Sequence, residues 1–126
     1  IDLAGNILPG APVWTTDFGA QYDVGLLGGG ASVRMDYTWK SSYFSNAFNR
    51  SNGPNDFGLT DYVPSQGYLS ATVTWVDASS LWEVQLFGRN LTDNAALTYA
   101  APSYAGGTSV NYAAPRTFGV KVTRNF

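Results

Sequence analysis

Five segments of this chain alternate apolar and polar residues with a period of two. They span residues 13–27, 31–43, 67–76, 81–91 and 114–126. The second is the clearest, because every odd position from Val33 to Trp39 is apolar and every even position from Ser32 to Lys40 is polar. Side chains point to alternate faces of a strand, so this pattern predicts β-strands with one apolar and one polar face. A helix would scatter the same apolar residues around its circumference.

The composition agrees with a chain of strands and turns. Aromatic residues make up 15% of the 126 residues, and there are 14 glycines. Both are typical of strands and turns rather than helices, and no run of apolar residues is long enough for a membrane-spanning helix. The sequence therefore predicts an all-β fold, an antiparallel meander of about five long strands.

The connections between these segments alternate in length. Short turns are predicted at 28–30 and 77–80, and long loops at about 44–66 and 92–113. In an antiparallel meander this order places the short turns at one rim and the long loops at the other, as in outer-membrane barrels. The first segment also has about fourteen residues, more than the usual ~5–6 of a globular strand. Five strands cannot close a barrel, so we expect further strands from elsewhere.

Several kinds of chemistry are excluded by composition. The chain has no Cys and no His, which removes disulfides, thiol chemistry, His-dependent catalysis and the usual zinc sites. Its net charge is −2, so no basic field is available for nucleic acid. We expect no enzymatic activity, no metal and no cofactor. Because the chain begins at Ile1 without a leader, we also expect it to be a piece of a longer protein.

A short motif stands before the last segment. The run from Leu86 to Asp93 reads Leu-Phe-Gly-Arg-Asn-Leu-Thr-Asp, and a Pro-Arg pair then opens a strand that ends on an aromatic residue. This arrangement resembles the carboxy-terminal signature of TonB-dependent receptors, and the match covers residues 82–126. The residues that carry the resemblance are Asn90, Leu91, Thr92, Asp93, Pro115, Arg116 and Phe126.

The resemblance implies the carboxy-terminal portion of a 22-stranded transmembrane β-barrel, in the outer membrane of a Gram-negative bacterium. Residues 1–126 would form wall and loops, and the plug domain of the family would be absent. The implied partners are the remainder of the barrel and its plug, the TonB–ExbB–ExbD system acting through that plug, the outer-membrane assembly machinery reading the last strand, and the lipid bilayer. The implied function is energised uptake of a scarce nutrient, with a ferric siderophore expected before cobalamin, haem or oligosaccharides.

The long loops carry the candidate ligand-binding residues. Their aromatic rings suit flat ligands or sugars, and an arginine suits a carboxylate or catecholate. The residues are Tyr43, Phe44, Asn46, Phe48, Asn49, Arg50 and Tyr62 in the first loop, and Tyr99, Tyr104 and Tyr112 in the second. Any solvated rim would carry similar residues. Charges on the polar faces are expected to pair across strands.

A second interpretation remains open at this level. A soluble β-sandwich would bury the same apolar faces between two sheets and use its aromatic loops as a binding module. It predicts a closed fold without further chain. The strand lengths, the alternating connections and the motif favour the membrane barrel.

Overall fold

The computed structural model describes residues 2–51, 59–103 and 106–126, and within them it is entirely β. The strands are β1 (Thr15–Leu26), β2 (Gly29–Lys40), β3 (Tyr43–Phe44), β4 (Tyr62–Val63), β5 (Gln66–Val76), β6 (Trp82–Arg89), β7 (Leu97–Pro102), β8 (Thr108–Tyr112) and β9 (Thr117–Arg124). The described part of the chain contains no helix that is long and apolar enough to cross a membrane. The predicted all-β class is confirmed.

The chain divides into two compact units. The sheet unit comprises Asp17–Thr38, Gly67–Asn94 and Ala114–Phe126. The loop unit comprises Ile1–Thr16, Trp39–Gln66 and Ala95–Ala113.

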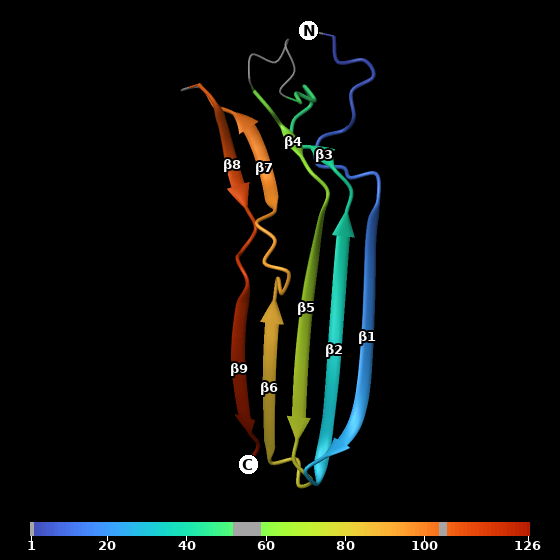
Figure 1. Cartoon of the computed structure of the whole chain (residues 1–126), viewed down its shortest axis with the longest axis vertical. Coiled ribbons are helices and arrows are strands. Elements are labelled where there is room, and N and C mark those ends of the chain that lie inside the picture. The colour runs from blue at the N-terminus through green and yellow to red at the C-terminus, as the bar shows by residue number, and fades with distance from the viewer. Residues whose placement is uncertain (1, 52–58, 104–105) are drawn as a thin grey trace. The chain divides into compact units, whose positions relative to one another are not determined.

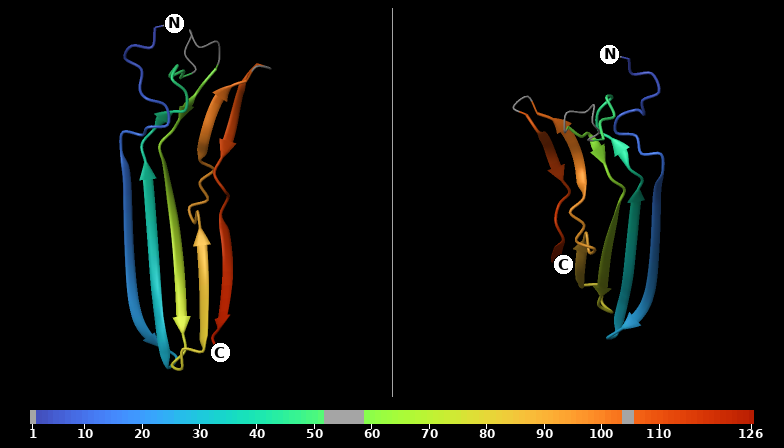
Figure 2. Two further views of the ribbon diagram at one scale, coloured as in Figure 1. Left: turned by 180° about the vertical axis from the view of Figure 1, so that it is seen from behind. Right: turned by 45° about the horizontal axis from the view of Figure 1, so that its top comes forward.

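The sheet unit is built on one antiparallel sheet of five strands in the order β1-β2-β5-β6-β9. Figure 1 shows these strands side by side, with the β1–β2 and β5–β6 turns at the same end as the end of β9. Each of the five predicted segments overlaps one of them, although β2 and β5 begin two residues and one residue before their segments, and the antiparallel sheet of five long strands is confirmed. The described sheet is open, with β1 and β9 at its edges, and the sheet unit contains no further strands that would form a second layer (Figure 2).

The β1–β2 turn begins one residue earlier than predicted and is one residue shorter. It was predicted at Gly28–Gly30, whereas the two turn residues are Leu27 and Gly28, with φ of 52° and 75°. Positive φ at both positions matches the right-handed twist of a two-residue hairpin. Gly29 instead belongs to β2, where an added Cβ would overlap the carbonyl oxygen of Val76. The glycine serves close strand approach at this position rather than the turn.

The register of β5, β6 and β9 places apolar residues in rows across one face. Val73 lies opposite Leu86, which lies opposite Val120. The next row joins Trp75, Val84 and Val122. On the other face, Gln85 stands between Thr74 and Lys121. The two faces therefore differ in chemistry, as the alternation predicts.

Glycine–aromatic pairs explain where the alternation weakens, at Phe87 and Gly88. Gly88 pairs with Phe118 on the apolar face, where an added Cβ would lie 2.6 Å from Cδ2 of Leu91 and 3.1 Å from Cδ1 of Phe118. On the polar face Phe87 pairs with Gly119 and its ring covers that glycine. Each ring fills the space that its glycine partner leaves open, so both exceptions improve packing between β6 and β9.

The loop unit has more secondary structure than predicted. Residues 44–66 and 92–113 were predicted as long loops, but β3 pairs with β4 and β7 pairs with β8 as two antiparallel ribbons. Val63 and Ala100 are fully buried, and Ala96 is nearly so. The ribbons escaped prediction because β3 and β4 have two residues each and β7–β8 contains a register shift, which breaks the period of two.

Candidate functional site

Five of the predicted ligand-binding aromatics lie on the strands of the loop unit, and Phe48 lies in a turn. Tyr43 and Phe44 form β3, Tyr62 begins β4, and Tyr99 and Tyr112 lie in β7 and β8. Tyr104 lies outside the described residues. The rings of Phe44 and Tyr62 meet edge to face, with centroids 5.6 Å apart and planes at 64°. This is a favoured aromatic geometry that holds β3 to β4.

Tyr43 has a structural role in the loop unit. Its hydroxyl donates a hydrogen bond of 2.9 Å to the carbonyl oxygen of Thr98 in β7. The neighbouring Ser45 hydroxyl donates to the carbonyl oxygens of Ala100 and Asp61. The bonds to Thr98 and Ala100 connect the first long segment to the second, so the Tyr43 hydroxyl is engaged in the fold rather than available to a ligand.

The two predicted asparagines also serve the fold. The Asn49 amide accepts from the backbone N–H of Ile7 at 2.6 Å and donates to the Ile7 carbonyl at 3.0 Å. It adopts φ of 51° and donates a further bond to the carbonyl of Asn46. The Asn46 side chain accepts from the N–H of Phe48 at 3.3 Å. Asn49 thus fixes the segment around Ile7, a contact that no sequence pattern predicts.

Arg50 and Phe48 form the best candidate ligand contact. The guanidinium carbon of Arg50 lies 4.5 Å from the centre of the Phe48 ring, a cation–π distance. Phe48 is 38% exposed. An arginine held on an exposed ring combines a positive charge with a flat apolar surface, which suits an anionic aromatic group.

Three tyrosine rings of the loop unit are also exposed. The exposed fractions are 39% for Tyr62, 43% for Tyr99 and 63% for Tyr112. The register places Tyr99 opposite Asn111 and Tyr112 opposite Leu97. Together with Phe48 and Arg50, these side chains are the predicted site residues that the fold leaves available.

The sequence motif has a clear structural role in the sheet unit. Asn90 is 6% exposed and adopts φ of 51°. Its amide donates to the carbonyls of Asn94 and Ala114, each at 3.0 Å, and accepts from the N–H of Asn94 at 3.0 Å. Sequence reasoning missed Asn94, whose own amide donates to Gly67 at 3.2 Å. Asn90 therefore closes the turn after β6 and fastens it to the segment before β9.

The remaining motif residues extend this connection. Asp93 accepts from the N–H of Arg116 at 3.4 Å, and its carboxylate also lies 3.4 Å from the Arg116 guanidinium. The N–H of Leu91 donates to Leu69 in β5. Thr92 and Pro115 are exposed. The two halves of the motif, separated by more than twenty residues, thus meet at the start of β9.

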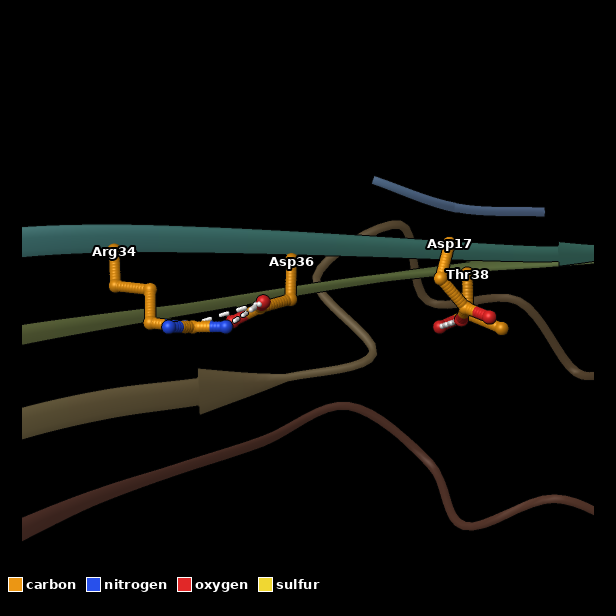
Figure 3. A network of polar contacts seen from close by, with 4 residues as sticks. All are labelled: Asp17, Arg34, Asp36 and Thr38. Atoms are coloured by element: carbon orange, nitrogen blue, oxygen red, sulfur yellow. Dashed lines mark hydrogen bonds and ion pairs between the residues drawn. The ribbon is translucent and has the colours of Figure 1, made fainter. Parts of the chain in front are cut away.

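The polar face of the sheet carries a small network (Figure 3). Arg34 and Asp36 form an ion pair of 2.7 Å, and Asp17 accepts a 2.6 Å hydrogen bond from the hydroxyl of Thr38. Ion pairs were predicted between neighbouring strands, and for these residues that prediction is wrong. Arg34 and Asp36 both belong to β2, and the partner of Asp17 on the neighbouring strand is the neutral Thr38. The reason is Gly19, since a Cβ there would lie 2.9 Å from Oδ1 of Asp36 and its absence makes room for the pair.

No grouping of three or more acidic residues that would hold a metal ion occurs in residues 2–51, 59–103 and 106–126. Comparison of the chain with protein-family models, curated proteins and solved structures returned no significant match.

Proposed function

We propose that this chain is part of the wall of an outer-membrane TonB-dependent transporter that takes up a scarce nutrient, with a ferric siderophore as the first candidate. The observation that carries the proposal is the contrast between the two faces of the five-stranded sheet. One face is predominantly apolar across all five strands, and the sheet unit places no second layer of strands against it.

The exposure of large apolar side chains on this face is extensive. Phe18 and Tyr22 in β1 are 68% and 70% exposed, and Phe118, Val120 and Val122 in β9 are 71%, 66% and 59% exposed. A continuous apolar surface of this kind causes association in water. Lipid covers such a face in a transmembrane barrel, where the other face lines a wet interior.

The edges and ends of the sheet support a larger barrel. Both edge strands, β1 and β9, have unpaired backbone groups that a membrane would not tolerate. Additional strands of the same barrel would pair with them. The short turns lie together at one end of the sheet, and both long connections leave from the other, which is the arrangement of outer-membrane barrels. The motif around Asn90 and Arg116, together with the strand that follows it, resembles the carboxy-terminal signature of the receptor family and so supports the same proposal.

The ligand would contact the exposed part of the loop unit. Phe48 and Arg50 offer an aromatic face with a positive charge, which complements the catecholates of a ferric siderophore. Tyr62, Tyr99 and Tyr112 add exposed rings.

The first experiment tests the membrane location. The native protein that contains these residues should be extracted from the outer membrane only with detergent, and should migrate differently on a gel before and after heating. A monodisperse species of 13.5 kDa in plain buffer would contradict the barrel and favour the β-sandwich binding module.

The second experiment tests the ligand site. Arg50→Gln should weaken binding of a ferric catecholate siderophore by about tenfold, because it removes one charge-assisted contact. The control is Arg89→Gln, since Arg89 also lies over a phenylalanine, 5.7 Å from the Phe87 ring, but belongs to β6. Equal binding by wild type and both variants would remove Arg50 from the site.

A further inference from the structure

Arg124 occupies an unusual position at the end of the apolar face. The register places it opposite Trp82, in the same alternation as Phe118, Val120 and Val122. Among the described residues on this face of β5, β6 and β9 it is the only charged side chain. A cation on an otherwise apolar face needs a partner that is both anionic and attached to apolar material.

The surroundings of Arg124 hold its guanidinium in place without neutralising it. The guanidinium carbon lies 5.2 Å from the centre of the Trp82 ring and 5.1 Å from that of Phe126. Asn125 fixes the end of β9, because its N–H and its amide donate to the carbonyls of Leu81 and Ser80. In the described part of the chain the ion pairs are Arg34–Asp36 and Arg116–Asp93, so no carboxylate there pairs with Arg124.

A groove of about 370 Å³ lies further along the same face. Its apolar lining includes Val73, Leu86 and Val120, together with Ala71, Gly88 and Phe118. Val120 is four residues from Arg124, which corresponds to roughly 13 Å along a strand. One leaflet of a bilayer core is about 15 Å deep, half of its total thickness. An acyl chain that extends from a phosphate at Arg124 along β9 would therefore reach the groove within one leaflet.

We infer that Trp82, Arg124 and Phe126 form a binding site for the phosphate of a phospholipid, whose acyl chain lies along Val122 and Val120 into the groove. Arginine presents planar donors that suit phosphate, and the two rings suit the level of the headgroups. This inference rests on the proposed membrane location, because a phospholipid occupies the face only if that face contacts a bilayer.

The test uses the native protein purified from membranes in mild detergent, stripped of lipid and titrated with phosphatidylglycerol under native mass spectrometry. Arg124→Gln should weaken retention of the lipid by about fivefold, the effect of one basic residue at an anionic membrane surface. Arg124→Lys should retain most of the binding. Lys121→Gln is the matched control, since Lys121 lies on the polar face of the same strand opposite Gln85. Diacylglycerol, which lacks phosphate, should bind wild type and Arg124→Gln equally.

The outcomes separate this site from its rivals. Equal lipid binding by Arg124→Gln and Lys121→Gln, with both proteins still membrane-bound and heat-modifiable, would overturn the site but leave the barrel intact. Displacement of the lipid by inorganic phosphate alone would also overturn it, in favour of a free-anion site. If the protein never partitions into membranes, that result would contradict the proposed function itself.

A second measurement avoids variants of Arg124 that fail to assemble. Brominated phosphatidylglycerol should quench the fluorescence of the wild-type protein more than brominated diacylglycerol does. The difference should disappear in Trp82→Phe. Equal quenching by the two lipids would contradict the inference.

Discussion

Gly29 and Gly30 are neighbours in β2 with different surroundings. A Cβ at Gly29 would overlap the Val76 carbonyl and lie 3.0 Å from Cα of Asp77, whereas a Cβ at Gly30 would have nothing within 4 Å. Backbone atoms cannot swing aside as a side chain does. We therefore expect Gly29→Ala to destabilise the folded protein by about 1 to 3 kcal/mol, the usual cost of overpacking. Gly30→Ala should leave stability unchanged or slightly raised.

The measurement is the urea concentration at the midpoint of unfolding in detergent, compared for the two variants. Equal midpoints would show that β2 and β5 do not approach each other as closely as the structure has them.

Asn90 makes a second prediction at the residue scale. Replacing it by alanine removes the acceptor for the Asn94 N–H and the donor to the Ala114 carbonyl, in a residue that is 6% exposed. Buried polar groups that lose their partners cost about 1 to 3 kcal/mol, and alanine also tolerates the positive φ less well than asparagine. Asn90→Ala should lower the temperature at which the folded gel band converts to the unfolded band.

The control for this change is Asn111→Ala, because Asn111 is an exposed residue of β8. The same conversion temperature for both variants would reduce the motif to a sequence resemblance without a stabilising role.

The β5–β6 turn is an element that should respond to pH. Hydrogen bonds from the Ser79 hydroxyl and the Trp82 N–H hold the pKa of Asp77 below its ordinary value. The group's pKa is depressed in the folded state, so its contribution to stability is present above the unfolded pKa and disappears as pH falls through the folded pKa. Thermal stability should therefore fall as the pH is lowered below about 4.

Asp77→Asn separates this turn from the other carboxylates. Asparagine can still accept hydrogen bonds but does not titrate in this range. The variant should be less stable at neutral pH and should lose less stability on acidification. An acid response identical to that of the wild type would place the titrating groups elsewhere.

The element scale also shows what sequence patterns reveal and what they miss. The five long strands could be predicted from the alternation of apolar and polar residues. This alternation also fixes the face of each side chain, because a shift of one residue in the pairing would move every apolar side chain to the polar face. The ribbon β3–β4 did not follow, since two-residue strands carry no period. The ribbon β7–β8 did not follow either, because its register shift breaks the alternation. The exchange at Phe87 and Gly88 was visible in the sequence, but its reason lay thirty residues away in Phe118 and Gly119.

The candidate site shows the same division. Its aromatic residues were recognised from composition, and their exposure decides which of them remain available. The fold takes up Asn46, Asn49 and Tyr43 in hydrogen bonds. Short-range patterns cannot anticipate this, because the partner of Asn49 is Ile7, more than forty residues away.

At the scale of the whole molecule, the proposal depends on what covers the apolar face. Val120 lies near the middle of this face in β9, and Thr123 lies on the polar face of the same strand opposite Glu83. Arginine at the midplane of a lipid-facing barrel surface costs about 2 to 4 kcal/mol, and less near either interface. Val120→Arg should therefore strongly reduce the yield of folded, heat-modifiable protein in membranes, and Val122→Arg should reduce it less.

Thr123→Arg is the matched control, because a wet interior tolerates an added charge. If lipid covers the apolar face, Val120→Arg must reduce the yield of folded protein more than Thr123→Arg does. Val122→Arg must also reduce this yield less than Val120→Arg does. In water, Val120→Arg would instead leave folding unchanged or improve solubility, since the side chain is 66% exposed within the chain. A second protein sheet would penalise the substitutions according to local packing, without a gradient toward Arg124. The gradient thus distinguishes a bilayer from either alternative covering.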